Sequence, residues 1–417
     1  MTERLYYTDP YLTEFDALVI DVSNVAGRTG VVLDRTAFYP TSGGQSFDTG
    51  TIGGARVVDV VDGDDGVIVH VVEGEAASGL GAPAFAPSAT AGRRGSELVS
   101  CRVDWARRFD HMQQHTGQHV LSAAIDRVGG VRTESFHLGA DTATIDLARE
   151  LTTAEIAASE DAANEVVWAD LPVIIKFADA AEAAALNLRK ESIRTGTLRI
   201  IDIDGFDVSA CGGTHVRRTG AIGVIAISGW ERLRGGTRLE FKCGGRALRA
   251  HRTLRDTVRD SSGLLSIAPG ELPQAIERLQ GESKELRRRL KDAGARLAVF
   301  EAEVLAAKGQ AVAGFRLIVE ALAADAGTLK TMAQTISASP GRVAVLVTSA
   351  SPVSIVVSRS ADVAAVDAAR VLKALLGRFG GKGGGRPEMA QGGGLDASAE
   401  SVVAAARALL SPTATDN

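Results

Sequence analysis

Two short motifs of this chain carry side chains that could bind one metal ion. His115 and His119 lie four residues apart in DHMQQHTGQHVL, and Cys211 and His215 lie four residues apart in SACGGTHV. Residues i and i+4 of a helix share one face, so both imidazoles of the first pair can reach one ion. Three His and one Cys would complete the tetrahedron that zinc prefers. The sequence therefore predicts one Zn²⁺ site that joins segments about ninety residues apart.

The scarcity of these residue types supports this prediction. A single His-x-x-x-His pair is often accidental. The chain has only 7 His and 3 Cys among 417 residues, however, and 3 of the His and 1 of the Cys lie in these two motifs. Cys101 and Cys243 are expected to be small core residues, and His70 is expected at the surface.

A glycine-rich segment near the N-terminus, VLDRTAFYPTSGGQSFDTG, has two interpretations. The structural one is a strand, a turn at Pro40 and a bulge at Gly43 and Gly44, as is common in β-barrels. The functional one depends on the hydroxyl and amide groups around the bend, among them Thr36 and Gln45. Such groups could bind a small polar ligand.

Composition indicates a globular protein from a reducing compartment. The chain is 45% hydrophobic and 23% charged, has a net charge of -5, and has too few cysteines for a disulfide framework. Neither a secretory leader nor an apolar run long enough to span a bilayer occurs, which predicts a cytoplasmic protein with no membrane partner. Basic residues nevertheless concentrate between residues 220 and 255, where Arg238 and its neighbours could contact a phosphate backbone.

The pattern of the chain predicts an α+β multidomain fold with four regions. Residues 1–95 contain alternating runs such as VVDVVDG, typical of a small antiparallel β-barrel. Residues 96–255 combine the metal motifs, a helix near 107–125 and further strands in an α+β core. Residues 256–310 are expected to form a helical linker, and residues 311–417 alternate strands with helices as in a small α/β domain.

Two features of the second half bear on partners. Apolar residues recur every seven positions over 270–306, which predicts a long helix that either pairs with a second chain or folds back within its own. A homodimer through this helix or through the C-terminal domain is therefore expected as one alternative. The tract FGGKGGGRPEMAQGGG is either a flexible loop or a place where glycine amides, Lys382 and Arg386 meet an anion. It lacks P-loop spacing, so no ATP site is expected.

Four motifs in a fixed order resemble a known family. The segments LDRTAFYPTSGGQSFDTG, HTGQH, CGGTH and RLEFKCGGRAL are similar to the editing half of alanyl-tRNA synthetases and to the free-standing AlaX alanyl-tRNA editing proteins. The closing FGGKGGGRPEMAQGGG resembles the C-terminal DHHA1 domain of the same synthetases. Because that domain is included, the resemblance is to the long form, AlaX-L, and it covers nearly the whole chain.

The resemblance implies an enzyme that hydrolyses the ester of tRNA(Ala) mischarged with serine, and in some members glycine, while sparing alanyl-tRNA. The family's zinc ligands match His115, His119, Cys211 and His215, and its substrate-reading threonine matches Thr36. Its C-terminal domain contacts the tRNA elbow, which would place Lys382 and Arg386 at the nucleic acid.

Physical chemistry agrees with this function and raises one difficulty. A site that hydrogen-bonds the serine hydroxyl can reject alanine, and Thr36 is the expected donor or acceptor, although a threonine is also simply a good strand former. Four protein ligands close a zinc site, so the ion either gains a ligand on substrate binding or only orients the tRNA end. His111, one turn before His115, is either a polar helix residue or a catalytic proton carrier.

Three other classes of protein stay under consideration. A complete synthetase would need an aminoacylation domain before Thr36, which only about thirty-five residues precede. A non-catalytic zinc protein could bind tRNA or dimerise without deacylating anything. A phosphoesterase with the same C-terminal domain would need an Asp-His-His triplet, whereas Asp110 and His111 are followed by Met112.

Overall fold

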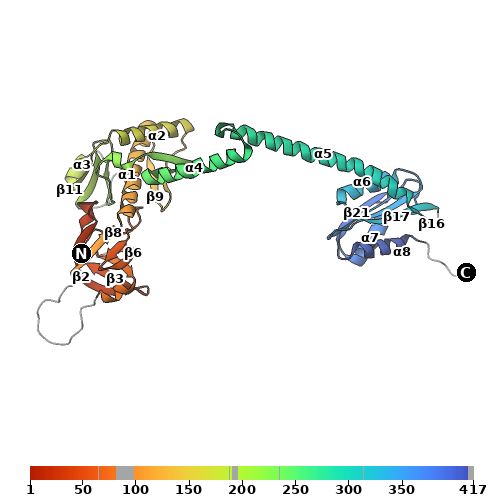
Figure 1. Cartoon of the computed structure of the whole chain (residues 1–417), viewed down its shortest axis with the longest axis horizontal. Helices are drawn as coiled ribbons and strands as arrows, with labels where there is room; N and C mark the ends of the chain where they lie inside the picture. Colours follow the sequence, from red (N-terminus) through yellow and green to blue (C-terminus); the bar gives the residue numbers. More distant parts are fainter. Residues whose placement is uncertain are drawn as a thin grey trace, which may run out of the picture. The chain divides into compact units, whose positions relative to one another are not determined.

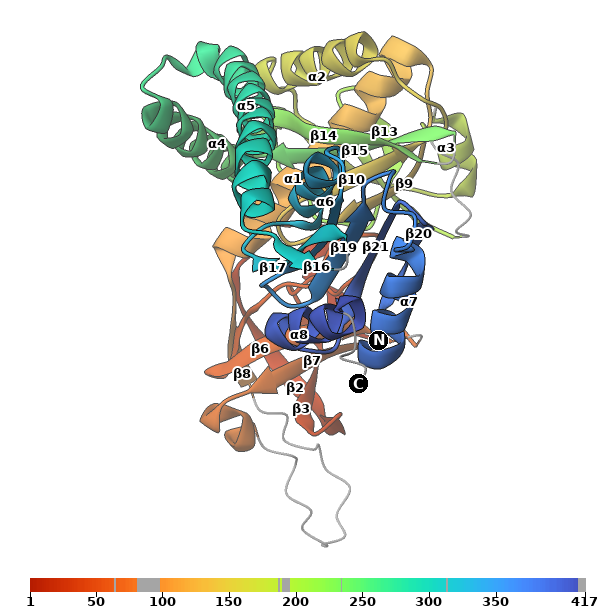
Figure 2. The ribbon, with the colours of Figure 1, turned by 90° about the vertical axis from the view of Figure 1, so that its right-hand side faces the viewer.

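The computed structural model describes the chain apart from residues 64, 81–97, 187, 190–195, 234, 313 and 412–417. The chain divides into two compact units, Met1–Asp260 and Ser261–Asn417, and each is described by itself (Figures 1 and 2). The α+β multidomain class predicted from the sequence is confirmed. No helix in the described part of the chain is both long and apolar enough to cross a membrane.

The first unit begins with a closed antiparallel barrel. Its strand order is β2-β3-β7-β6-β5-β8, and β8 closes the barrel by pairing with β2. Alternate side chains point inward, and apolar residues from all six strands fill the interior. A short parallel pair, β1 with β4, carries the N-terminal segment and its 3-10 turn η1 beside the barrel. The elements are β1 (Glu3–Arg4), η1 (Leu5–Tyr7), β2 (Glu14–Val25), β3 (Arg28–Leu33), β4 (Arg35–Thr36), β5 (Gly50–Ile52), β6 (Ala55–Asp62), β7 (Ile68–Glu73), η2 (Glu75–Gly79) and β8 (Leu98–Val103).

The rest of this unit packs two small sheets around a central helix, α1 (Trp105–Gly129). One sheet has the order β14-β15-β10-β9 and the other has the order β11-β12-β13. The other elements are β9 (Thr133–Leu138), β10 (Ala143–Leu147), α2 (Thr153–Trp168), β11 (Val173–Ala178), α3 (Ala180–Ala185), β12 (Leu198–Ile203), β13 (Val208–Ala210), η3 (Thr219–Ile222), β14 (Ile225–Leu233), β15 (Gly236–Cys243) and α4 (Gly244–Leu265).

Helix α1 is the element that places the first metal motif. It ends at Gly130, whose φ of 62° is the left-handed conformation that glycine adopts at helix ends. Gly117 lies in the middle of the helix because any side chain there would overlap the sulfur of Cys243 on β15. A buried ion pair between Arg108 and Asp48 joins the helix to the barrel side of the unit. Helix α1 is thereby held against both neighbours, which fixes the positions of its histidines.

The second unit is a six-stranded sheet, β16-β17-β18-β19-β21-β20, with helices on both faces. Val343, Val345 and Val347 of β18 pack with α7 and α8, whereas Ala344 and Leu346 pack with α6 and the end of α5 (Figure 2). The elements are η4 (Pro269–Glu271), α5 (Leu272–Ala307), β16 (Gln310–Val312), β17 (Phe315–Leu322), α6 (Ala326–Ser337), β18 (Arg342–Thr348), β19 (Val353–Arg359), α7 (Ala368–Phe379), β20 (Lys382–Arg386), β21 (Met389–Leu395) and α8 (Ala399–Leu410).

The glycine-rich tract of this unit is a β-hairpin, not the loop that its composition suggests. Strands β20 and β21 pair antiparallel from Lys382 with Gly393 to Arg386 with Met389. A Cβ on Gly383 would lie 2.5 Å from the Gln391 carbonyl oxygen, and one on Gly385 would overlap the backbone of Ala390. Gly383 and Gly385 are therefore required by the close approach of the two strands.

Candidate metal centre and adjoining pocket

The two motifs converge on one cluster of four side chains. His115 and His119 extend from α1, and Cys211 and His215 extend from the loop after β13. Their ligand atoms all lie within 4.8 Å of one another. The Cys211 sulfur is 3.4 Å from His115 Nε2 and 3.3 Å from His215 Nε2. In a tetrahedron with ordinary zinc bond lengths the sulfur-to-nitrogen edges would be about 3.5 Å, so these donors fit Zn²⁺.

A second layer of hydrogen bonds orients the three imidazoles. His115 donates from Nδ1 to Gln45 Oε1 at 2.7 Å, and His119 donates from Nδ1 to Asp207 Oδ2 at 2.7 Å. The Nδ1 of His215 lies 3.2 Å from the hydroxyl of Thr116. With Nδ1 engaged, each ring presents Nε2 to the cluster, as metal-binding histidines commonly do.

The electrostatics of the cluster set the protonation of its ligand atoms before a metal binds. Burial raises the pKa of Cys211, but the neighbouring His115 and His215 outweigh this and hold that pKa well below its usual value. This shift favours the thiolate, the form that binds metal. Burial lowers the pKa of His119, yet its hydrogen bonds to Asp207 and Cys211 raise it to about 9, so a bound metal must displace a proton from this ring. Asp207 also accepts from Arg189 Nε at 2.5 Å, which holds the carboxylate in place.

The CGGTH loop is fixed from outside by Arg199 of β12. The Arg199 guanidinium donates to the carbonyl oxygens of Cys211 at 2.7 Å and Gly213 at 2.9 Å. It also donates to the Tyr7 carbonyl at 2.9 Å, so one side chain joins the loop to the N-terminal segment. Gly213 has no room for a side chain, because a Cβ there would overlap the ring of His115. Nothing in the sequence pattern had singled out Arg199 or Asp207.

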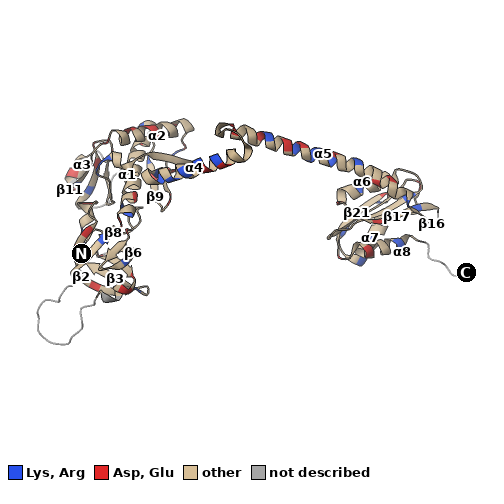
Figure 3. Ribbon diagram, in the orientation of Figure 1, with Lys and Arg blue, Asp and Glu red and all other residues tan. Residues whose placement is uncertain are grey.

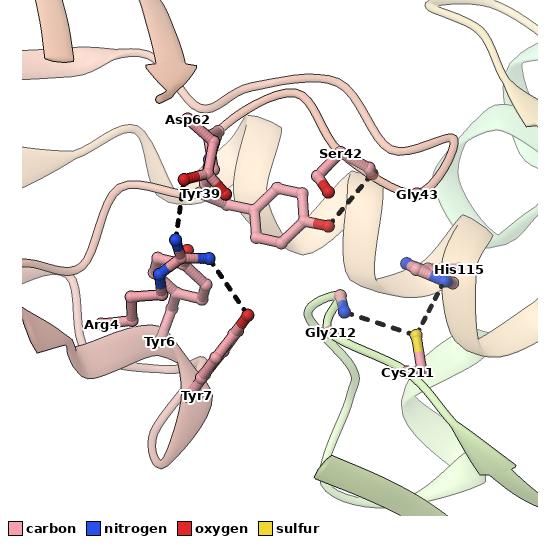
Figure 4. A pocket seen from close by; sticks show the side chains of 12 residues that line it. Arg4, Tyr6, Tyr7, Tyr39, Ser42, Gly43, Asp62, His115, Cys211 and Gly212 are labelled. Carbon is pink, nitrogen blue, oxygen red and sulfur yellow. Dashed lines mark hydrogen bonds and ion pairs between the residues drawn. The ribbon is translucent and has the colours of Figure 1, made fainter. Parts of the chain in front are cut away.

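A pocket of about 90 Å³ opens beside the metal ligands. Its wall on one side is His115, Cys211 and the two glycines after the cysteine. The opposite wall comes from the N-terminal segment and the barrel, as Figure 4 shows. The complete lining is Arg4, Tyr6, Tyr7, Tyr39, Pro40, Ser42, Gly43, Asp62, His115, Cys211, Gly212 and Gly213.

The structure places Thr36 away from this pocket. Its side chain is fully buried in the barrel, and its hydroxyl lies 2.8 Å from His70 Nε2. His70 must donate from Nδ1 to the Val31 carbonyl at 3.0 Å, so its Nε2 accepts from Thr36. The Thr36 oxygen also accepts from the Phe38 amide at 3.1 Å. The expectation that His70 lies at the surface is wrong, because β7 turns it into the barrel, and burial lowers its pKa to about 4.

The glycine-rich turn contributes to both the pocket and the metal ligands. Gly43 and Gly44 have φ of 51° and 80°, and Ser42 and Gln45 exchange backbone hydrogen bonds across them. Two central residues with positive φ make a tight turn that favours glycine. Gly43 lines the pocket, and Gly44 lies too close to Phe136 for a side chain. Gln45 is fully buried, and its amide bonds His115 and Thr214.

The remaining predicted residues lie elsewhere. His111 is buried, does not line the pocket, and leaves its Nδ1 without a hydrogen-bond partner among the described residues. Burial, with Arg107 nearby, lowers its pKa to about 4. Arg238 makes a two-pronged ion pair with Asp146 at 2.7 and 2.9 Å. Lys382 and Arg386 are exposed at the two ends of β20 in the second unit.

Most charges of the basic stretch are balanced within the fold. Arg246 is buried against Asp110 at 2.6 Å, and Lys242 lies 2.7 Å from Glu240. Farther along, the many blue positions on α4 in Figure 3 are interleaved with acids such as Asp256, which accepts from Arg255 at 3.0 Å. Sequence clustering of basic residues therefore overstates the positive charge of this surface.

Comparison with known proteins adds three family matches. The model described as "Threonyl and Alanyl tRNA synthetase second additional domain" matches residues 198–240, which include the CGGTH motif. The DHHA1 domain matches residues 314–411. The model described as "tRNA synthetases class II (A)" matches residues 11–81.

Curated relatives match most of the chain. The alanyl-tRNA editing protein AlaX-L of Pyrococcus horikoshii is 36% identical over 288 residues, which are 67% of this chain and 66% of that protein. The alanine–tRNA ligase of Pyrococcus abyssi is 35% identical over 406 residues, 94% of this chain and 42% of the ligase. That of Methanoculleus marisnigri is 34% identical over 410 residues, 95% of this chain and 42% of the ligase. The chain thus spans less than two thirds of each of these relatives.

Proposed function

Because the chain is homologous to the alanyl-tRNA editing protein AlaX-L and to the matching regions of alanine–tRNA ligases, we propose that it edits mischarged tRNA(Ala). In this proposal it hydrolyses the ester bond of seryl-tRNA(Ala), with glycyl-tRNA(Ala) as a second substrate, and spares alanyl-tRNA(Ala). All three of its cysteines are free, which suits the reducing cytoplasm.

The single observation that carries the proposal is the contact between the four-residue cluster and a small polar pocket. His115 and Cys211 belong both to the cluster and to the pocket wall. The pocket is lined by polar groups of Tyr7, Tyr39 and Ser42 as well as by the two cluster residues, which suits a short polar side chain such as serine.

The cluster would hold Zn²⁺ through His115, His119, Cys211 and His215, and the ion would supply positive charge beside the ester carbonyl. The chain's own groups would do the rest. The Gly43 turn and the CGGTH loop enclose the aminoacyl group from two sides. Holding the ester and a water molecule next to each other lowers the activation barrier of hydrolysis. The reactants have then already lost the translational and rotational freedom that the reaction would otherwise cost.

The second unit would hold the body of the tRNA. Lys382 and Arg386 are exposed on one strand, and each phosphate contact adds affinity that weakens with salt. The three strand residues between them are all glycine, so a nucleic-acid backbone could approach the peptide groups of β20 closely. Arg238 is a weaker candidate contact because Asp146 already neutralises it.

A dimer is a second proposal, and the exposed face of α5 favours it. Leu286, Leu290, Leu297 and Phe300 are 64%, 75%, 56% and 67% exposed. Apolar side chains at this spacing are typical of helices that pair with another helix. A non-catalytic protein that only binds tRNA or dimerises would share this feature, so activity must be measured directly.

The deciding experiment uses tRNA(Ala) charged separately with serine, glycine and alanine. The purified protein should release serine, and glycine to a lesser extent, far faster than alanine, and treatment with a strong zinc chelator should abolish release. A protein that retards all three tRNAs in a gel without releasing any amino acid would be the non-catalytic alternative, and the editing proposal would then be wrong.

A further inference from the structure

The pocket wall opposite the metal ligands is built by the tyrosine-rich N-terminal segment. Tyr6, Tyr7 and Tyr39 lie together, with the Tyr6 ring 5.0 Å from Tyr7 and 5.3 Å from Tyr39, both edge to face. Tyr7 faces the cysteine loop in Figure 4. A Cβ built on Gly212 would lie 3.5 Å from the Tyr7 hydroxyl, so this hydroxyl is next to the residue that follows Cys211.

Most hydroxyl groups near the pocket are already used or closed off. The Thr36 hydroxyl is occupied by His70 and the Phe38 amide. Tyr39 donates its proton to the Ser42 carbonyl at 3.1 Å. The Tyr6 hydroxyl has no hydrogen-bond partner among the described residues, but its oxygen is buried away from solvent. Tyr7 differs from Tyr6 because it is only partly buried and its oxygen accepts from Arg4 at 3.2 Å, while its own proton has no acceptor among the described residues.

Tyr7 is also held more firmly than Ser42, whose hydroxyl interacts with that of Tyr39. Arg4 holds the Tyr7 oxygen and is itself fixed by Asp62 at 2.7 Å. Arg199 holds the Tyr7 carbonyl, and its guanidinium carbon lies 5.5 Å from the ring centre. Ser42 has one rotatable hydroxyl on a turn. A donor fixed before binding loses less entropy when it meets its acceptor.

We propose that the Tyr7 hydroxyl, positioned by Arg4 and Asp62, donates a hydrogen bond to the side-chain hydroxyl of the bound seryl group and thereby selects serine over alanine. This inference rests on the proposed editing function and assigns its specificity to a residue other than Thr36. A pocket that merely fits alanine and serine by size separates them weakly, whereas a polar group left unpaired by alanine separates them strongly. The Tyr7 hydroxyl has a proton unused by any described residue, lies beside the CGGTH loop and is held in place by Arg4.

The test is Tyr7→Phe, which removes one oxygen and keeps the ring. We expect kcat/KM for seryl-tRNA(Ala) to fall about 10- to 100-fold, while the rate on glycyl-tRNA(Ala), which has no hydroxyl to read, stays unchanged. Arg4→Met should give a smaller fall of the same kind, because it frees the Tyr7 oxygen without removing it. Tyr11→Phe is the matched control in the same segment, since Tyr11 does not line the pocket.

Three outcomes would overturn the assignment. The residue has another role if Tyr7→Phe retains full seryl activity, if it loses seryl and glycyl activity equally, or if it loses zinc together with activity. Here zinc content and thermal unfolding are measured alongside the rates. If the wild-type protein releases no amino acid, the editing proposal fails by itself. Binding of non-hydrolysable seryl and alanyl amides of adenosine then still decides whether Tyr7 distinguishes the two side chains.

Discussion

Replacement of Gln45 by methionine tests whether this residue supports the metal ligands or touches substrate. Gln45 is fully buried, accepts from His115 Nδ1 at 2.7 Å and from the Thr214 amide at 3.2 Å, and donates to the Thr214 hydroxyl at 2.8 Å. Methionine keeps the length but has no such groups. Loss of an outer hydrogen bond to a ligand typically weakens metal binding about 10- to 100-fold, or about 1.4 to 2.7 kcal/mol.

Stability should fall as well, because two buried N–H groups lose their acceptor. Each unpaired group costs about 1 to 3 kcal/mol, so the free energy of unfolding should drop by about 2 to 6 kcal/mol. Zinc affinity is measured by competition with a chromophoric chelator and stability by urea unfolding. Gln118→Met is the control, since Gln118 is also buried on α1 but its side chain bonds only Ser122 among the described residues. Zinc affinity equal to that of the control, combined with lost seryl activity, would make Gln45 a substrate contact and refute this reasoning.

Three further predictions concern the metal loop, the barrel and the long helix. Gly213→Ala should bind less than about half the zinc of the wild type, because the new methyl group overlaps the ring of His115. Gly212→Ala should bind zinc normally. Equal zinc contents of the two variants by metal analysis would contradict this prediction. His70 has a folded pKa of about 4 against an ordinary value of 6.5, so protonation favours the unfolded chain and stability should fall between these pH values as pH decreases. The fall should be about 3 kcal/mol smaller in His70→Gln, and identical pH profiles in urea unfolding would show that His70 is not buried. Leu290→Glu should convert a dimer to a monomer in sedimentation velocity without changing helicity, because Leu290 is 75% exposed on α5. A wild-type protein that is already monomeric would contradict the dimer proposal.

The metal cluster could be predicted from the sequence because its signal is local. Four-residue spacing on a helix sets which side chains share a face, and His and Cys are rare enough for two such pairs to be informative. The long helix and the α+β class follow from periodicity in the same way. Thr36 could not be placed, because β4 has only two residues and gives no alternation from which to read the buried face.

Other features depend on contacts between distant segments. Gln45 meets His115 across seventy residues of sequence, and Arg199 meets the Tyr7 carbonyl across 192. No spacing rule connects such residues. The tract from Gly383 to Gly385 suggested a loop because glycine weakens isolated strands, yet here the two strands lie so close at Gly383 and Gly385 that only glycine fits there. In each case the local structure depends on a contact with a residue that is distant in the sequence.

The most direct test of the account is the coordination of the bound metal. X-ray absorption at the zinc edge of the purified protein should show one sulfur at about 2.3 Å and three nitrogens at about 2.0 to 2.1 Å, and Cys211→Ala should remove the sulfur. Two or more sulfur ligands, a sulfur that persists in Cys211→Ala, or a protein that never retains zinc would contradict the claim that His115, His119, Cys211 and His215 form one metal site.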